Sequence, residues 1–360
     1  MAWAVPEYKP EIVNAAGKAL GKMEFPVVTD EGFDALKVIN NWRAAHAYPL
    51  NTFQITLRHR ARKIESDVVI AQRAKRLDSI HRKLASKLTM RMTQMQDIAG
   101  CRAVFVRLQN VYKLVDAYKS GKFDHKFRNE KDYIVSPKVD GYRSFHLVYE
   151  YVGTQQTKVY DGLRVEIQIR TQLQHSWATA VEAVGIFTRQ ALKSNQGDED
   201  WLRFFALMSS AIAAIEGTPC VPDTPTKKSE LVAELKRLAA KLRAREMLRA
   251  YNTTLDTLGS SKDAKYFIVQ LDPEAGRVTV RRYKAKESAE ANRVYTDLES
   301  QIADDSRQQV VLVSVADINA LKRAYPNYFL DTALFSKLVE RVLRSEFPDP
   351  VPAEINSVQT

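Results

Sequence analysis

Cysteine is scarce in this chain, and long apolar runs are missing. The only cysteines among the 360 residues are Cys101 and Cys220, with no histidine cluster beside them. This excludes a disulfide scaffold and a zinc site of the usual Cys/His type. No stretch reaches the roughly 18 apolar residues that a membrane-spanning helix needs. The first residues, MAWAVPEYKPEIV, lack the basic start and apolar run of a signal peptide. We therefore expect a cytoplasmic protein without a membrane segment.

Positive charge is present in excess. The formal net charge is +11. Residues 57–87 hold ten Lys or Arg against three acidic residues, so much of the excess falls in one short stretch. A basic surface suits polyanions such as nucleotides or RNA, although many basic proteins have no such ligand.

Apolar spacing divides the chain into helical and strand-like parts. Helical spacing predicts helices over 30–88, 108–120, 172–190, 199–216, 228–250, 287–302, 316–324 and 329–345. Alternation and β-branched residues predict strands over 101–106, 132–136, 144–152, 163–171, 265–272, 277–283 and 308–315. This pattern indicates an α+β fold. Three prolines in 217–228 predict a linker between a first domain, 1–216, and a smaller C-terminal α+β module, 229–350, followed by a tail, 351–360.

The strand predicted over 163–171 carries the most informative polar pattern. Alternate side chains of a strand share a face, so Glu166, Gln168 and Arg170 lie together, opposite the apolar residues between them. The polar face can be a reactive site or only a solvated outer face.

Three further segments carry groups that suit phosphate chemistry. Lys131 and Lys138 flank a Gly-containing turn that presents Tyr142, so cations and a stacking ring are close in sequence; an ordinary hairpin with surface lysines is the alternative. Asp97 can join Glu166 in holding Mg²⁺, which typically binds one or two carboxylates plus phosphates. In 72–84, Lys75, Ser79 and Lys83 recur every four residues and share a helix face, which can hold a triphosphate or be merely solvated.

In this order, the segments resemble the nucleotide pyrophosphokinase domain of RelA/SpoT proteins. The matching pieces are RAKRLDSIHRK (73–83), DIAGCR (97–102), KDYIVSPKVDGYRSFH (131–146) and EIQIRT (166–171). The resemblance implies a mixed β-sheet flanked by helices, and an enzyme that transfers the β,γ-pyrophosphate of ATP to a ribose 3′-hydroxyl with Mg²⁺ as cofactor.

The resemblance also implies roles for individual residues. ATP contacts are implied at Arg73, Lys75, Ser79, Lys83 and Arg102, acceptor contacts at Lys131, Lys138, Tyr142 and His146, catalytic roles at Asp97, Glu166 and Gln168, and Mg²⁺ ligands at Asp97 and Glu166. Asp140 departs from the family pattern, which has Asn there, so the acceptor contacts can differ from those of a guanine nucleotide. The roles of His175 and Glu182 stay open. No adjacent His-Asp pair occurs, so we expect no hydrolase half.

Two acceptors fit the resemblance. One is GDP or GTP, which would make the product a (p)ppGpp alarmone. The other is the 3′-CCA end of tRNA, whose modification by toxic members of the family stops translation. The basic stretch would then bind tRNA through Arg58, Arg60 and Arg62. A third reading is an inactive synthetase kept as an RNA-binding module.

The C-terminal segment AYPNYFLDTALF (324–335) favours the tRNA reading. It resembles CapRel-type proteins, which fuse a toxic synthetase to an antitoxin module. That resemblance implies that Tyr325 and Tyr328 fold back and block the ATP site until a phage protein releases them, as a defence against infection. Aromatic residues at a helix start are also often plain core residues. From the sequence we expect an autoinhibited toxin–antitoxin that acts on tRNA.

Overall fold

The structure is a computed structural model of the chain. It describes residues 3–24, 27, 29–87, 89–188, 192, 198–249, 254–258, 264–272, 274–275, 277–302, 308–315, 321, 323, 325 and 332–347. The helices are α1 (Pro10–Leu20), α2 (Asp30–Ala45), α3 (Ala47–Arg62), α4 (Leu77–Ser86), α5 (Leu108–Lys119), α6 (Gln172–Thr188), α7 (Glu199–Glu216), α8 (Lys228–Lys241), α9 (Ala244–Arg249), α10 (Ser288–Ser300) and α12 (Ala333–Leu343). The strands are β1 (Val69–Ala74), β2 (Ala99–Phe105), β3 (Lys126–Asp132), β4 (Phe145–Glu150), β5 (Arg164–Thr171), β6 (Thr254–Leu258), β7 (Ala264–Asp272), β8 (Arg277–Lys284) and β9 (Gln309–Ser314). Short 3₁₀ helices are η1 (Met92–Gln94), η2 (Gln155–Tyr160) and η4 (Ala285–Glu287).

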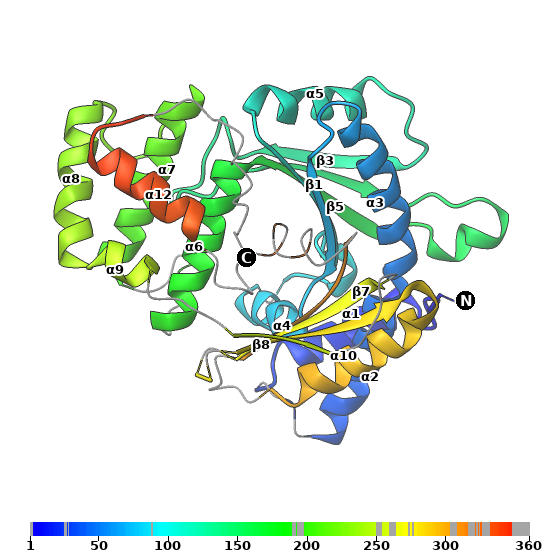
Figure 1. The fold of residues 1–360 in the computed structure, drawn as a ribbon. Coiled ribbons are helices and arrows are strands. Elements are labelled where there is room, and N and C mark those ends of the chain that lie inside the picture. The colour runs from blue at the N-terminus through cyan, green and yellow to red at the C-terminus, as the bar shows by residue number, and fades with distance from the viewer. Residues whose placement is uncertain are drawn as a thin grey trace.

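One curved sheet runs through the whole molecule (Figure 1). Its nine strands follow the order β3-β4-β5-β2-β1-β9-β7-β8-β6. The pairs β2–β5 and β6–β8 are parallel and the other neighbours are antiparallel, so the sheet is mixed. The predicted α+β class with a mixed sheet flanked by helices is confirmed.

The C-terminal strands continue the sheet of the N-terminal half. β9 pairs with β1, where Gln72 lies opposite Ser314 and Arg73 opposite Val313. The polar groups of both halves therefore meet at one seam. The domain boundaries placed at 217–228 stay a prediction.

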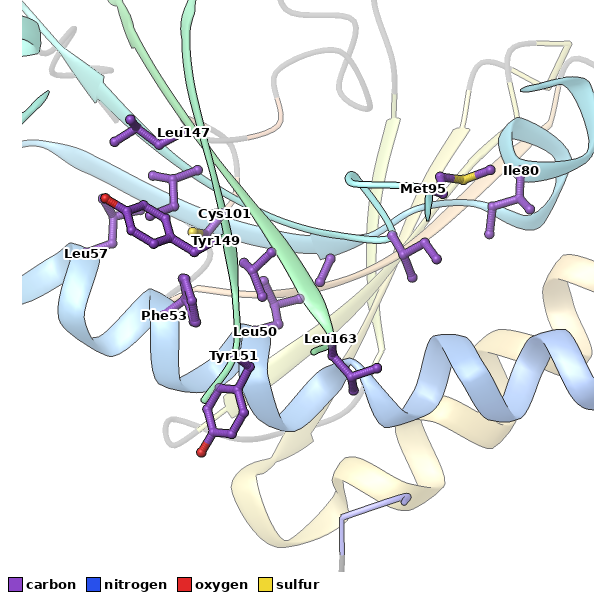
Figure 2. Packing of buried hydrophobic residues seen from close by; sticks show 14 of the residues in the cluster. Leu50, Phe53, Leu57, Ile80, Met95, Cys101, Leu147, Tyr149, Tyr151 and Leu163 are labelled. Atoms are coloured by element: carbon purple, nitrogen blue, oxygen red, sulfur yellow. The ribbon is translucent and has the colours of Figure 1, made fainter. Parts of the chain in front are cut away.

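The two faces of the sheet are covered by different helices. On one face, Phe53 and Leu57 of α3 pack in the same buried cluster as Ile167 and Ile169 of β5 (Figure 2). On the other face, Ala183 of α6 joins a cluster built from β1, β2, β7, β8 and β9. Because side chains alternate along a strand, Glu166 and Gln168 of β5 lie on the face away from α3.

A helical layer stands beside this second face. α12 packs on α6, α8 and α9 in the structure, and the rings of Phe205 and Phe335 lie 5.8 Å apart. α7, beneath it, starts where the Asp198 side chain accepts from the Trp201 backbone and ends at Gly217, whose φ of 65° suits glycine.

Three sequence-based assignments are wrong. The predicted helical stretch 30–88 contains β1, because VVIAQRA pairs with β2 and β9, which periodicity does not reveal. The predicted strand 132–136 is a turn after β3, because Asp132 Oδ1 accepts from the amides of Ile134 and Val135. The predicted helix 228–250 is broken between α8 and α9, where Arg243 has a φ of 48°.

Other assignments agree closely with the structure. The strands predicted over 144–152 and 163–171 and the helices over 108–120, 172–190 and 199–216 are confirmed within a few residues. β6 was not predicted, and most of 316–324 lies outside the described residues. Within the described ranges, every helix is too short or too polar to cross a membrane.

Candidate active site

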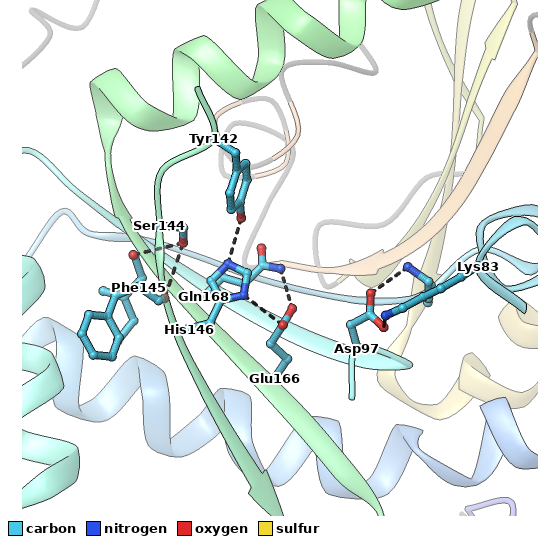
Figure 3. Close-up of polar contacts among 10 residues, drawn as sticks. Lys83, Asp97, Tyr142, Ser144, Phe145, His146, Glu166 and Gln168 are labelled. Atoms are coloured by element: carbon cyan, nitrogen blue, oxygen red, sulfur yellow. Dashed lines mark hydrogen bonds and ion pairs between the residues drawn. The ribbon is translucent and has the colours of Figure 1, made fainter. Parts of the chain in front are cut away.

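A row of hydrogen bonds joins three strand residues to the turn before β4 (Figure 3). His146 of β4 lies opposite Gln168 of β5 in the antiparallel register. The His146 Nδ1 atom is 3.0 Å from Glu166 Oε1, and Gln168 Nε2 donates to Glu166 Oε2 at 2.7 Å. The other nitrogen of His146 is 2.9 Å from the Tyr142 hydroxyl. Both oxygens of Glu166 are thus held in place, and the side chain is almost fully buried.

The charges in this row stabilise one another. Burial alone would lower the pKa of His146, but Tyr142 and the Glu166 carboxylate raise it to about 9. Burial would raise the pKa of Glu166, yet the neighbouring His146 lowers it. Burial would likewise raise the pKa of the Tyr142 phenol, and His146 lowers it to about 8. At neutral pH we therefore expect a protonated His146 paired with an ionised Glu166.

Asp97 lies between two lysines just before β2. Lys75 Nζ donates to one carboxylate oxygen at 2.7 Å and Lys83 Nζ to the other at 2.8 Å. Burial would raise the pKa of Asp97, but the two ammonium groups hold it well below its usual range. Lys75 follows β1, and α4 carries Lys83 one turn after Ser79. The predicted triphosphate-binding lysines thus meet at the predicted Mg²⁺ ligand.

Glu166 and Asp97 fit a Mg²⁺ site supplemented by phosphates. Glu166 lies opposite Gly100 in the β2–β5 register, and Asp97 comes three residues before Gly100, so one carboxylate lies on β5 and the other just before the neighbouring strand β2. Among the described residues, no group of three or more His, Cys, Asp or Glu is arranged to hold a metal by itself. Two oxygen donors with bound phosphates completing the shell are typical of Mg²⁺.

Arginines from three neighbouring strands gather on the same face. Arg73 of β1, Arg102 of β2 and Arg170 of β5 interact electrostatically, and burial together with this repulsion lowers the pKa of Arg170. The Arg102 guanidinium carbon lies 5.9 Å from the centroid of the Tyr325 ring. Tyr325 is itself buried in the sheet cluster. The predicted ATP contacts Arg73 and Arg102 are therefore brought together, with Tyr325 beside them.

Residues whose roles the sequence left open join this arginine cluster. His175 of α6 contacts the Arg170 guanidinium through its Nδ1 atom, and its Nε2 atom is 3.3 Å from the Arg323 carbonyl. Glu182, further along α6, acts electrostatically on Arg102 and Arg170. The alternation of β5 indicated Arg170 as a site residue, whereas nothing in the sequence placed α6 over it.

The predicted acceptor side lies at the turn before β4. Lys138 Nζ is 5.1 Å from the centroid of the Tyr142 ring and 4.8 Å from that of Tyr133. Lys131 is exposed and lies opposite His146 in the β3–β4 register. Asp140, the departure from the family pattern, accepts a 2.8 Å bond from the Tyr142 amide. Asn can accept the same bond, so this Asp shapes the turn.

The predicted tRNA contacts are not brought to this site. Arg58, Arg60 and Arg62 belong to α3, which covers the opposite face of the sheet. Arg60 donates to the carbonyls of Ala117 and Lys122 and stacks on aromatic rings, so it ties α3 to the end of α5. Tyr328, the second predicted inhibitory residue, lies outside the described residues.

Comparison with known proteins identifies the segment that holds this site. Residues 72–190 match the model of a region found in RelA / SpoT proteins. The chain is 36% identical over 112 residues to GTP pyrophosphokinase YwaC of Bacillus subtilis, covering 30% of this chain and 52% of that protein. It is 38% identical over 85 residues to GTP pyrophosphokinase YjbM of the same organism, covering 24% of this chain and 39% of that protein.

The chain thus spans about half the length, or less, of these two curated relatives. Among solved structures, small alarmone synthetase 2 from Bacillus subtilis matches with a TM-score of 0.42 and 23% identity, over 49% of this chain and 93% of that one. Asp97, Tyr142, His146, Glu166 and Gln168 all fall inside the matched residues. Residues 72–190, which hold the site, are therefore similar to the region found in RelA/SpoT proteins.

Proposed function

We propose that this chain is a pyrophosphokinase that transfers the β,γ-pyrophosphate of ATP to the 3′-hydroxyl of a guanine nucleotide. The observation that carries the proposal is the buried Tyr142–His146–Glu166 row beside an Asp97 held by Lys75 and Lys83. All six residues lie in the segment that matches the RelA/SpoT region.

The site supplies what phosphoryl chemistry requires, which is alignment and charge neutralisation. Lys75 and Lys83 are placed to bind the triphosphate, and Arg73 and Arg102 can hold the adenine between their planar groups. Asp97 and Glu166 would hold Mg²⁺, which neutralises charge on the phosphates when it is bound.

The transfer balances as a single displacement. The acceptor 3′-oxygen forms a bond to the β-phosphorus, and the bond from that phosphorus to the α-phosphate oxygen breaks. AMP leaves. The hydroxyl proton passes to Glu166, since His146 already carries its own proton and serves to orient the carboxylate.

A guanine nucleotide replaces tRNA as the preferred acceptor. The matched relatives are named as GTP pyrophosphokinases. Asp140, which had argued against a guanine nucleotide, bonds within its own turn instead. Arg58, Arg60 and Arg62, the expected contacts if tRNA were the acceptor, lie on α3 behind the sheet. The tRNA 3′ end stays the second candidate, because Lys131 and Lys138 are exposed beside the acceptor turn and can reach a nucleic acid backbone.

Acceptor labelling tests the proposal. The protein is incubated with γ-labelled ATP and Mg²⁺ together with GDP, GTP or bulk tRNA, and each acceptor is separated. We expect label in GDP or GTP and matching AMP. Label in tRNA alone would restore the tRNA reading. An absence of AMP with every acceptor would favour the inactive RNA-binding module.

We also propose that Tyr325 limits ATP binding. Its buried ring lies against Arg102, one of the two arginines placed to hold adenine, and a ring–guanidinium contact of this kind contributes about 0.5–2 kcal/mol. Tyr325→Leu keeps apolar volume but removes the aromatic face. We expect a lower KM for ATP with a small loss of stability. An unchanged KM in a folded variant would show that Tyr325 is only a core residue.

Action as a toxin in anti-phage defence, with a phage protein as the trigger, remains a hypothesis that rests on the CapRel resemblance. Expression of Tyr325→Leu in a bacterial host tests it, because growth should stop without infection. That growth arrest should disappear when Glu166→Gln is added. Normal growth with soluble Tyr325→Leu would contradict the hypothesis.

A further inference from the structure

A cavity lies on the face of the sheet opposite Glu166, at the seam between β1 and β9. Its volume is about 280 Å³. Its walls come from both halves of the chain: α2 and β1 on one side, and β9 and α10 on the other. Figure 1 shows α2 and α10 together below the C-terminal strands. Arg73 of β1 is shared with the site described above, since it also borders this cavity, but Glu166, Gln168 and Asp97 do not line it.

Polar atoms without partners surround this cavity. Gln72 and Ser314 face one another across the seam and line the cavity, and both are buried. Within the described structure, Gln72 Oε1, Ser314 Oγ and Arg43 Nε have no hydrogen-bond partner. Gln54, behind Ser314, donates to the Ser314 carbonyl while its own Oε1 has no partner. An unsatisfied buried polar group typically costs about 1–3 kcal/mol, so the three such groups that line the cavity, on Gln72, Ser314 and Arg43, call for an occupant.

The wall indicates a neutral ligand. Three arginines line the cavity. Arg43 is buried and already paired with Glu299 at 3.0 Å, Arg293 is exposed, and the alternation of β1 turns the Arg73 side chain to the other face of the sheet. Burial lowers the pKa of His46, which also lines the cavity, to about 4, so its ring is uncharged at neutral pH. A triphosphate would find no cluster of lysines here. Trp3, Tyr266 and Tyr295 supply aromatic surface instead.

We infer that this cavity is a second binding site, which takes a neutral planar heterocycle of nucleobase or nucleoside size. The Gln72 amide and the Ser314 hydroxyl would hydrogen-bond to the edge of the heterocycle, which carries donors and acceptors. The aromatic residues of the cavity would pack against the faces of its ring. The volume is just below the roughly 300 Å³ at which small-molecule sites begin, which suits a ligand without phosphates.

The cavity wall is connected to the ATP side of the sheet. Arg43 contacts Tyr295 and Glu299 of α10, and Glu299 accepts from the Leu77 amide at 2.8 Å. Leu77 begins α4, the helix of Ser79 and Lys83. Gln72 immediately precedes Arg73 in β1. A ligand that orders this wall therefore also orders the start of α4 and the strand that carries Arg73, so we expect it to raise the affinity for ATP two- to tenfold.

Binding is tested directly, without reference to activity. Adenosine, guanosine and cytidine are titrated into the full chain by calorimetry, with and without a saturating non-hydrolysable ATP analogue, and with inorganic phosphate as a negative probe. The variant Ala44→Leu fills the cavity from α2, and Ala15→Leu on the exposed side of α1 is its matched control. We expect one nucleoside to bind when the analogue is present, and its binding to be lost only in Ala44→Leu.

Two results would overturn the inference. Nucleoside binding that disappears with the analogue but survives in Ala44→Leu would belong to the catalytic site. No binding of any nucleoside would mean that the cavity holds water only. Because no turnover is measured, either failure leaves the proposed pyrophosphokinase activity untouched.

A second variant checks the role of the unpartnered amide. Gln72→Leu removes the buried Oε1 atom while keeping apolar volume. If Gln72 Oε1 hydrogen-bonds only to a ligand, Gln72→Leu should unfold at the same temperature as the wild type or higher. The variant should also no longer bind the nucleoside. A lower unfolding temperature would show that Gln72 has a structural partner, such as water, and would contradict the inference.

Discussion

The two faces of the central sheet use the same strands in opposite ways. Toward α3, Ile167 and Ile169 of β5 are fully buried in an apolar cluster. Toward α6, Glu166 and Arg170 of the same strand are nearly as well covered but polar, and Gln168 between them is partly buried. One face gains stability from burial, whereas the other keeps like charges such as Arg102 and Arg170 close together at a cost. This difference indicates that the second face is arranged to bind a polyanionic ligand.

A substitution at Glu166 distinguishes the roles of the two faces most clearly. Glu166→Gln keeps the shape of the side chain but removes the proton acceptor and weakens Mg²⁺ binding. We expect the rate of pyrophosphate transfer per folded molecule to fall by about 10²–10⁴-fold, while the unfolding midpoint falls only through the loss of the charged pair with His146. Rates come from AMP formation and folding from circular dichroism. Glu130→Gln on exposed β3 is the matched control and should keep full activity. A Glu166→Gln protein with normal turnover would remove Glu166 from the mechanism.

The opposite face should respond in the opposite way. Phe53 of α3 is fully buried against the sheet and stacks on His125 at 4.6 Å. Phe53→Ala should lower the free energy of unfolding by about 3–5 kcal/mol, because it leaves a cavity. Urea unfolding measures the loss, and the turnover per folded molecule should stay near that of the wild type. A folded variant with a specific loss of turnover would show that the two faces are not independent.

Stability should also depend on pH through the polar face. The pKa of His146 is raised to about 9 in the folded chain from about 6.5 when unfolded. Its charged pair with Glu166 therefore contributes fully below pH 6.5, and the contribution is lost as the pH rises through 9. Urea midpoints should fall between pH 6.5 and 9 in the wild type. In His146→Asn this fall should be smaller, and an equal fall in both proteins would rule out the pair as its source.

The smallest effect is expected at the acceptor turn. Asp140→Asn preserves an oxygen that accepts from the Tyr142 amide, so transfer to a guanine nucleotide should change less than about threefold. Steady-state KM values for GDP and GTP measure this. A large fall in KM would mean that the Asp140 carboxylate repels the acceptor phosphates, as the sequence had suggested.

Local patterns in the sequence were sufficient for much of the site. The alternation of β5 placed Glu166, Gln168 and Arg170 on one face, and helical spacing placed Ser79 and Lys83 together. These inferences succeed because they depend on neighbours along the chain. The same helical spacing was wrong for Lys75, which precedes α4 because β1 ends at Ala74. The ionic contacts of Asp97 with Lys75 and Lys83 were not expected, because the family resemblance implied only that all three belong to one site.

Long-range pairing was beyond such patterns. β1 was taken for helix because a short apolar run fits either structure, and its partners lie about 30 and 240 residues away. The seam between β1 and β9 follows from that pairing, as do the unpartnered atoms of Gln72 and Ser314. The approach of Tyr325 to Arg102 was expected only by resemblance, and no periodicity would have shown it.

The central claim is that this chain transfers pyrophosphate as a unit. ATP labelled on the β-phosphate tests it most directly, because transfer of a single phosphate would leave this label in ADP. With a guanine nucleotide as acceptor, we predict that the β-label appears in the acceptor together with one AMP for each labelled product. Label retained in ADP, with no AMP formed, would contradict the account.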